Sequence, residues 1–192
     1  EIHMDEETQS YLGKINYQAG NRLGITFLEN KLTGSSDDLE TLVNLGELSI
    51  RNEKYQHSAK YLERAIKIDP NDTRSYVFLS KVALKVGNHN KAKEIISRAL
   101  QFAPEDIEIS LQRIEIEEAA SGTKSALEWI KDNLEDRISN TWQIVIKKAD
   151  LLAAADSKQA ALEFLKKHRE KHANTPLDIR MAQLYLEEGN LG

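Results

Sequence analysis

Two histidines lie four residues apart late in the chain, at a spacing that can hold a metal ion. His168 and His172 would share one face of a helix, because a helical turn takes 3.6 residues. Two ligands without a third make a weak site. The residues between them, Arg169, Glu170 and Lys171, do not form the metalloprotease pattern. We therefore predict a solvated pair, no bound metal and no other cofactor.

Three basic residues are spaced so that they fall on one face of a predicted helix. Arg74, Lys81 and Lys85 stand at positions i, i+7 and i+11. Such side chains form strong hydrogen bonds with carboxylates, so they could bind an acidic group of a peptide. A solvated helix face has the same composition, and both interpretations stay open.

The residue patterns of known catalytic sites are missing. The chain has no glycine-rich phosphate loop, no nucleophile elbow and no cysteine. Its glycines mark turns instead, at Gly87, Gly122 and Gly189. We predict that the protein is not an enzyme.

The elements that carry these residues repeat with a period of 34 residues. Small residues recur at Gly24, Ser58, Ala92, Ala126 and Ala160. Bulky apolar residues follow four positions later, at Leu28, Leu62, Ile96, Ile130 and Phe164. A fixed period of this length indicates one helix–turn–helix unit stacked repeatedly.

The two clearest units cover residues 39–72 and 73–106. The predicted turns lie at Asn52-Glu53 and Gly87-Asn88, and a proline follows each second helix, at Pro70 and Pro104. Small residues at Gly46, Ser80, Ser58 and Ala92 should let the paired helices approach closely.

This pattern resembles the tetratricopeptide repeat family. The matching residues are Leu45, Gly46, Ser58, Leu62, Ala65 and Pro70, and then Leu79, Ser80, Gly87, Ala92, Ile96, Ala99 and Pro104. The resemblance implies an all-α, right-handed superhelical solenoid of antiparallel helix pairs. It would span residues 5–192 as one solenoid, with repeats near 5–38, 39–72, 73–106, 107–140 and 141–174 and a partial one at 175–192. Residues 1–4 read as a cloning remnant.

The later repeats depart from the pattern. Arg113 and Lys147 occupy positions where the resemblance implies a large apolar residue, and Lys148 and Lys167 positions where it implies a small one. Two first helices are predicted to carry shifted apolar stripes, at Ile107, Leu111 and Ile114 and at Trp142, Val145, Ile146, Ala149 and Leu152. The second helices are predicted to keep register through Ala126, Ile130 and Leu134 and then Ala160 and Phe164.

The resemblance implies that a partner binds a concave groove lined by the first helix of each pair. The predicted partner-binding residues are Val43, Glu47, Ile50, Arg51, Arg74, Val77, Lys81, Leu84 and Lys85. Val43 and Val77 belong to an aliphatic series that could form an apolar strip for a helix or peptide, or lie buried between helices. The Lys and Asn of the carboxylate clamp of some relatives are missing, because Val43, Glu47 and Val77 take their places.

Charge is distributed unevenly along the chain. The fourth unit is acidic at Glu105, Asp106, Glu108, Glu115, Glu117 and Glu118, and the later part is basic at Lys158, Lys166, Lys167, Arg169 and Lys171. These patches could steer a partner or promote head-to-tail self-association, or they could only keep the helices solvated. The net charge of −5 argues against a nucleic-acid binder, and no apolar run is long enough to span a membrane.

The function predicted from the sequence is protein–protein interaction, by a scaffold or adaptor that receives a peptide or helix of a partner in its groove. Two alternatives stay open. One is a structural or self-assembling module of a bacterial secretion or exopolysaccharide machine, and the other is a regulatory repeat domain of a larger enzyme. Both ends of the chain look cut, so we expect a piece of a longer protein. The compartment, cytoplasmic or periplasmic, stays open.

Overall fold

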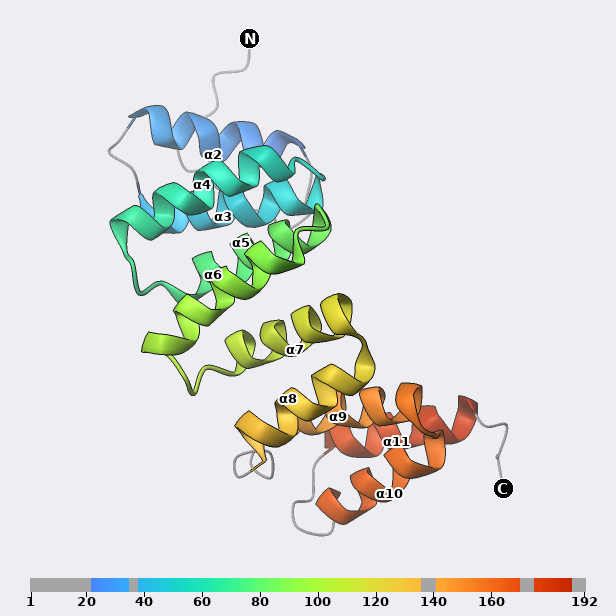
Figure 1. Cartoon of the computed structure of the whole chain (residues 1–192). Helices are drawn as coiled ribbons and strands as arrows, with labels where there is room; N and C mark the ends of the chain where they lie inside the picture. Colours follow the sequence, from blue (N-terminus) through green and yellow to red (C-terminus); the bar gives the residue numbers. More distant parts are fainter. Residues whose placement is uncertain (1–21, 35–37, 136–140, 170–174, 188–192) are drawn as a thin grey trace. The chain divides into compact units, whose positions relative to one another are not determined.

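The computed structural model of the chain describes residues 22–34, 38–135, 141–169 and 175–187 (Figure 1). Within these ranges it contains helices and no strands. The helices are α2 (Arg22–Gly34), α3 (Leu39–Arg51), α4 (Tyr55–Ile68), α5 (Thr73–Lys85), α6 (His89–Phe102), α7 (Ile107–Ser121), α8 (Thr123–Leu134), α9 (Trp142–Ala155), α10 (Lys158–Arg169) and α11 (Thr175–Glu187). The expected remnant at residues 1–4 lies outside the described residues.

Successive helices pack as pairs, α3 with α4, α5 with α6, α7 with α8 and α9 with α10. The prediction of an all-α fold built from antiparallel helix pairs is confirmed. The chain divides into two compact units, Glu1–Pro104 (unit 1) and Glu105–Gly192 (unit 2), which we describe separately.

The first helices of three pairs begin in the same way. The carboxylates of Asp38, Asp72 and Asp106 accept hydrogen bonds from the backbone amides three residues later, at distances of 2.9–3.1 Å. Each aspartate therefore satisfies an amide that the helix itself leaves free, and its charge suits the positive helix end. These caps begin α3, α5 and α7.

In unit 1, the close approach of α3 and α4 depends on Gly46. A Cβ atom at this position would lie 2.5 Å from Leu62 Cδ2, which is too short for a normal contact. The Ser58 hydroxyl donates a hydrogen bond of 2.8 Å to the Gly46 carbonyl oxygen. The predicted close packing at these small residues is confirmed.

In the next pair, α5 and α6, different small residues occupy the positions equivalent to Gly46 and Ser58. Ser80 replaces the glycine, and its hydroxyl donates to the Val77 carbonyl of its own helix at 2.8 Å. The facing residue on α6 is Ala92, which is fully buried. The hydroxyl group at this contact is therefore on the second helix in the pair α3–α4 and on the first helix in the pair α5–α6.

The predicted turns of unit 1 are confirmed, because α3 and α5 end just before them. Glu53 has φ 59° and Gly87, at the equivalent position, has φ 77°. Only glycine adopts this left-handed backbone without steric cost, which explains Gly87.

Unit 2 has its own hydrophobic core, which α7 to α11 share. The buried residues of three helices in unit 2 differ from the predicted apolar stripes. In α7, Ile107 is exposed while Ile109, Ile114 and Ile116 are buried, because this helix buries more than one face. In α9, Trp142 is 42% exposed and the buried residues are Ile144, Val145, Ala149 and Leu151. In α10, the buried residues are Ala161, Leu162 and Leu165, one position later than Ala160 and Phe164.

Basic residues at supposedly apolar or small positions are accommodated by ion pairs. Arg113 Nη2 lies 2.6 Å from the carboxylate of Glu117, which is 5% exposed. Lys147 pairs with Glu118 at 2.8 Å, and Lys148 pairs with Glu135 at 2.9 Å. These side chains keep their charged ends paired while their aliphatic stems cover the helices. Lys167 is exposed.

Candidate functional site

The predicted partner-binding residues all lie on α3 and α5, which pack against each other within unit 1. Val43 and Val77 are each 2% exposed, so a partner could not contact them without opening the unit. This corrects the expected aliphatic strip at these two positions, because the neighbouring helices cover it. The exposed and half-buried members form what we call the first-helix surface: Glu47, Ile50, Arg51, Arg74, Lys81, Leu84 and Lys85.

The apolar part of the first-helix surface consists of Ile50 and Leu84. Both are half-buried and occupy the same position in successive repeats. On the same helix as Leu84, Phe78 is also partly buried, and the Lys81 ammonium lies 5.3 Å from its ring centroid. Phe78 was not among the predicted residues, although its position three residues before Lys81 puts both on one face.

The charged part of this surface is held by ion pairs. Arg51 lies 2.5 Å from Glu47, one turn before it on α3. Arg74 lies 2.9 Å from Glu40, its equivalent in the preceding repeat, and its Nε is 3.1 Å from Asp72. The hydrogen bond to Glu40, with that to Asp72, raises the pKa of Arg74 despite partial burial.

These pairs limit the carboxylate-binding hypothesis. Arg74 already donates hydrogen bonds to two carboxylates of its own chain, Asp72 and Glu40. It would have to give up such a bond in order to bind an incoming acidic group. Lys81 is half-buried and Lys85 is exposed at the end of α5. The first-helix surface therefore presents two half-buried aliphatic side chains, Ile50 and Leu84, and two lysines, Lys81 and Lys85, towards the end of α5.

The His168 ring does not face a metal site. Its Nδ1 lies 2.9 Å from the Phe164 carbonyl oxygen, and the ring stacks at an angle on Phe164. His172 lies outside the described residues. Across the described ranges, no group of three or more His, Cys, Asp or Glu side chains could hold a metal ion.

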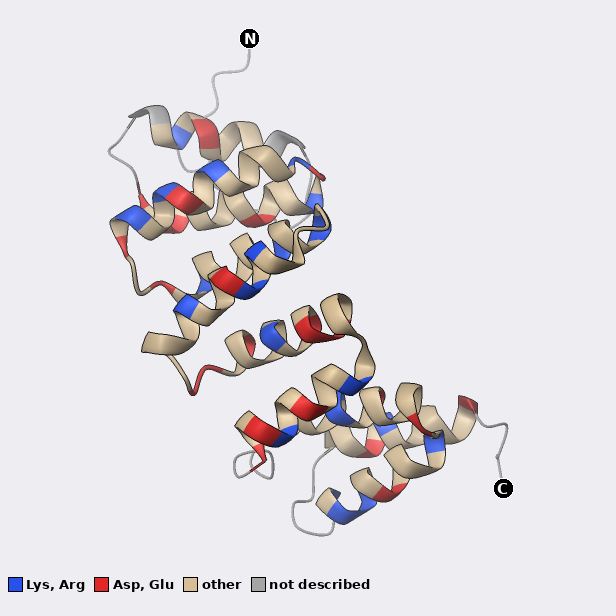
Figure 2. Ribbon diagram, in the orientation of Figure 1, with Lys and Arg blue, Asp and Glu red and all other residues tan. Residues whose placement is uncertain are grey.

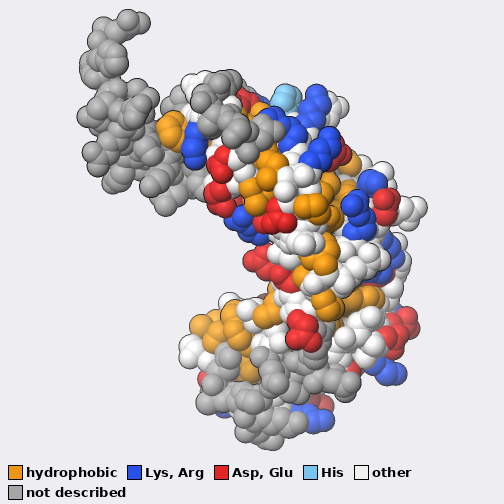
Figure 3. Space-filling model, turned by 90° about the vertical axis from the view of Figure 1, so that its left-hand side faces the viewer, with side chains coloured by type: hydrophobic (Ala, Val, Ile, Leu, Met, Phe, Trp, Pro, Cys, Tyr) orange, Lys and Arg blue, Asp and Glu red, His pale blue; other side chains and the backbone are white. Residues whose placement is uncertain are grey.

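Many of the charged side chains that form the predicted acidic and basic patches make hydrogen bonds or ion pairs within unit 2. Asp106 caps α7, and Glu117 and Glu118 are paired with Arg113 and Lys147. Among the basic residues, Arg169 pairs with Asp178, and Lys158 donates to the Glu187 carbonyl oxygen at 2.9 Å. Lys171 lies outside the described residues. Figure 3 shows acidic and basic side chains interspersed with hydrophobic ones on one face of the chain.

Comparison with known proteins agrees with this geometry. The tetratricopeptide repeat family model matches residues 49–114, from the end of α3 into α7. Residues 49–114 therefore belong to the tetratricopeptide repeat family. A search of curated protein sequences finds no match.

Solved tetratricopeptide repeat structures share this fold at low sequence identity. A thermophilic tetratricopeptide repeat protein of Thermus thermophilus is 20% identical, with a TM-score of 0.68 over 95% of this chain and 100% of that one. A tetratricopeptide repeat protein of Parabacteroides merdae is 13% identical, with a TM-score of 0.71 over 94% and 71%. Yeast Tom70 is 18% identical, with a TM-score of 0.69 over 88% of this chain and 37% of its own. At these identities the likeness concerns the fold alone.

The described helices are short, at 12–15 residues each. None of them has the length and apolar character that a membrane span requires.

Proposed function

We propose that this protein is an adaptor that binds a peptide or helix of a partner protein on its first-helix surface. The observation that carries the proposal is the recurrence of a half-buried aliphatic residue, Ile50 and then Leu84, at equivalent positions of α3 and α5. The helix-pair fold and the family match support a protein-interaction scaffold. We propose no catalytic role.

The charges around these residues would give the surface its selectivity. Lys81 and Lys85 would favour acidic residues near one end of the bound segment, and the Glu47–Arg51 pair would discriminate by shape and charge. The buried Val43 and Val77 would support the surface from beneath without contacting the partner.

A peptide selection tests this proposal. Peptides displayed on phage are selected on the wild-type protein, and the affinity of the best ones is measured by calorimetry. The double variant Ile50→Asp/Leu84→Asp should weaken binding by about tenfold or more, because it places charge where apolar contact is needed.

The matched control is Ile68→Asp/Ile107→Asp, which adds the same charge at exposed apolar positions on α4 and α7. This variant should bind like the wild type, and all proteins should keep the same circular dichroism. Equal affinity of both double variants would place the binding surface elsewhere.

Self-association is a second candidate, because α11 exposes apolar residues that other repeats bury. Ile179 is 53% and Leu186 57% exposed, whereas Val145, at the position equivalent to Ile179, is buried. Sedimentation velocity over a range of concentrations tests it. A mass that rises with concentration, and returns to the monomer value with Ile179→Asp/Leu186→Asp, would support self-association.

A further inference from the structure

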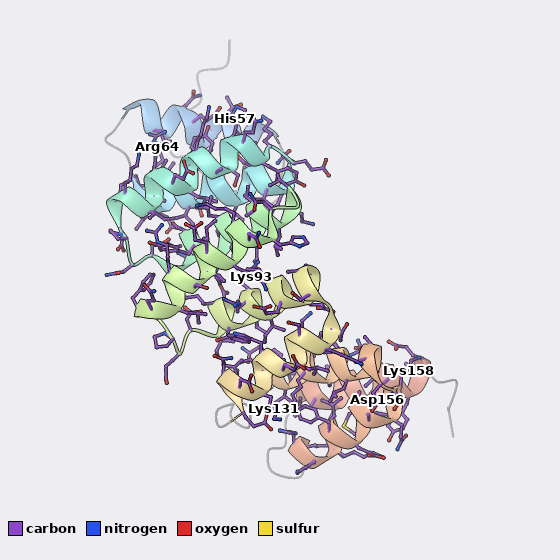
Figure 4. The ribbon with its side chains drawn as sticks, in the orientation of Figure 1. His57, Arg64, Lys93, Lys131, Asp156 and Lys158 are labelled. Atoms are coloured by element: carbon purple, nitrogen blue, oxygen red, sulfur yellow. The ribbon has the colours of Figure 1, made fainter. Side chains whose placement is uncertain are left out.

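A shallow depression runs along the exposed face of α4 in unit 1, away from the first-helix surface. Its volume is about 360 Å³, and its lining residues are His57, Lys60, Tyr61, Glu63, Arg64 and Lys67. Figure 4 shows His57 and Arg64 at separate points along α4. All six belong to one helix, so the depression does not depend on any movement between helices.

The lining is strongly basic. Lys60, Arg64 and Lys67 carry positive charges, His57 can carry a further one, and Glu63 is the one acidic member (Figure 2). The spacing i, i+3, i+7 and i+10 puts His57, Lys60, Arg64 and Lys67 on one side of the helix. The concentration of positive charge is local, because the whole chain has a net charge of −5.

Some of these basic side chains have no hydrogen-bond or ion-pair partner among the described residues. Among the described residues, the ammonium groups of Lys60 and Lys67 and the ring of His57 make no hydrogen bond or ion pair, and all three residues are exposed. They contrast with Arg51, Arg74, Arg113 and Arg180, which are each paired with a carboxylate. An incoming anion would therefore meet two lysines that have no internal partner to give up, whereas Arg64 already has an interaction within the chain.

The floor of the depression is rigid. Tyr61 packs on the apolar residues of α2 and α3, and its hydroxyl donates a hydrogen bond of 2.7 Å to Glu29 of α2. Burial, with this bond, raises the pKa of Tyr61 to about 12, so the hydroxyl stays protonated at neutral pH and keeps donating. The cations therefore stand around a fixed aromatic ring.

From these observations we infer that the α4 face is a second binding surface, which takes an extended acidic peptide segment of a protein partner. From His57 to Lys67 the helix rises by about 15 Å, which matches the length of about five residues of extended peptide. Carboxylates on alternate residues of such a peptide would meet Lys60, Arg64 and Lys67 in turn. The α4 face is distinct from the first-helix surface. A result that contradicts the proposed function would therefore leave this inference unaffected, and the reverse also holds.

A peptide fits this face better than a single-stranded nucleic acid. Binding of unpaired bases relies on several aromatic platforms. Among the lining residues, the Tyr61 ring is partly buried and held by Glu29, which leaves the imidazole of His57 as the one exposed ring. Glu63 would also repel a continuous phosphate backbone, whereas a peptide can place a neutral residue beside it.

Fluorescence anisotropy tests the inference on the whole chain. The probe is a short fluorescein-labelled peptide of alternating glutamate and alanine, measured at low and at physiological salt. The variant Lys60→Glu/Lys67→Glu should raise the Kd by about tenfold or more, and Lys60→Gln/Lys67→Gln should raise it less. Amide chemical shifts in α4 should respond to the wild-type titration.

The matched control is Lys124→Glu/Lys131→Glu, the same charge change at exposed positions of α8 in unit 2. It should leave the Kd within about twofold of the wild-type value, because Lys124 and Lys131 do not line the depression. Circular dichroism and thermal unfolding confirm that each variant is folded.

Each of the following results would overturn the inference. The first is equal weakening by the α4 and α8 variants, which would show a general charge effect. The second is displacement of the peptide by a single-stranded oligonucleotide of equal charge at lower concentration, which would make nucleic acid the better ligand. The third is equally tight binding of a lysine–alanine peptide, or shift changes confined to other helices.

Discussion

Gly46 and Leu62 define the tightest helix contact in unit 1. A methyl group added to Gly46 would lie 2.5 Å from Leu62 Cδ2 and 2.6 Å from its Cγ. Leu62 is fully buried, so its side chain has no free volume to move into. In an open helix, alanine is favoured over glycine by about 1 kcal/mol. Here the contact acts against that preference.

We predict that Gly46→Ala lowers the free energy of unfolding by about 1–3 kcal/mol, because overpacking outweighs the gain in helix propensity. Gly46→Leu should cost more. Urea unfolding followed by circular dichroism measures both. Gly87→Asn is the control, since no atom lies within 4 Å of a Cβ there and asparagine tolerates its left-handed backbone. A Gly46→Ala protein as stable as the wild type would disprove the close-contact explanation.

The helices of the repeats are defined at their starts as well as by their apolar faces. Asp38, Asp72 and Asp106 cap α3, α5 and α7 at a spacing of 34 residues. The hydrogen bond from the Thr41 hydroxyl is the main cause that lowers the pKa of Asp38, with the Thr41 amide and Lys31 adding to it and burial opposing it. A carboxylate with a lowered pKa stabilises the folded state only while it is ionised.

We predict that Asp38→Ala lowers the free energy of unfolding by about 1 kcal/mol at neutral pH. The folded-state pKa lies below the unfolded value near 3.8, so the contribution is complete above pH 4 or so and is lost as the pH falls further. Chemical unfolding at a series of pH values should show the two proteins converging in acid. Asp38→Asn keeps a hydrogen-bond acceptor and should lose less. A difference that stays constant down to strong acid would contradict the ionised cap.

At the scale of the whole molecule, the chain consists of two compact units. The core of unit 2 contains buried residues from α7 to α11, including Ile114, Ile130, Leu162 and Leu184. Two hydrophobic clusters of unit 1 lie among residues 25–78, and further buried apolar residues lie on α5 and α6, including Val82, Ala92 and Ile96. Repeat proteins gain stability from each repeat and from each contact between neighbours.

We predict that a fragment of residues 105–192 folds by itself, because every residue of its core cluster lies within it. Its circular dichroism should be that of a helical protein, and its urea transition should be cooperative. The midpoint should be no higher than that of the full chain, since a fragment loses any stabilisation by its neighbour. A helix content near zero in the fragment would show that unit 2 depends on unit 1.

The sequence predicted the repeating frame of this fold but not every surface. The small residues at Gly46, Ser58, Ser80 and Ala92 show the period directly, because close helix contacts tolerate few residue types. A period alone shows that Val43 and Val77 share a face, but not whether the next helix covers that face. The cap aspartates also recur every 34 residues, but a pattern of apolar residues does not reveal them. The ion pairs of Arg113 and Lys147 have no period, so only the structure could assign their partners.

The exchange of a hydroxyl group between Gly46–Ser58 and Ser80–Ala92 limits how this gene could be recombined. A first helix carrying Gly46 needs a second helix with Ser58, and a first helix carrying Ser80 is matched to Ala92. A chimera that joined α3 to α6 would lose the hydroxyl donor to the Gly46 carbonyl, and one that joined α5 to α4 would crowd two hydroxyls into one contact. Duplication or shuffling of whole helix pairs preserves both matches, so the heritable module here is the pair rather than the helix.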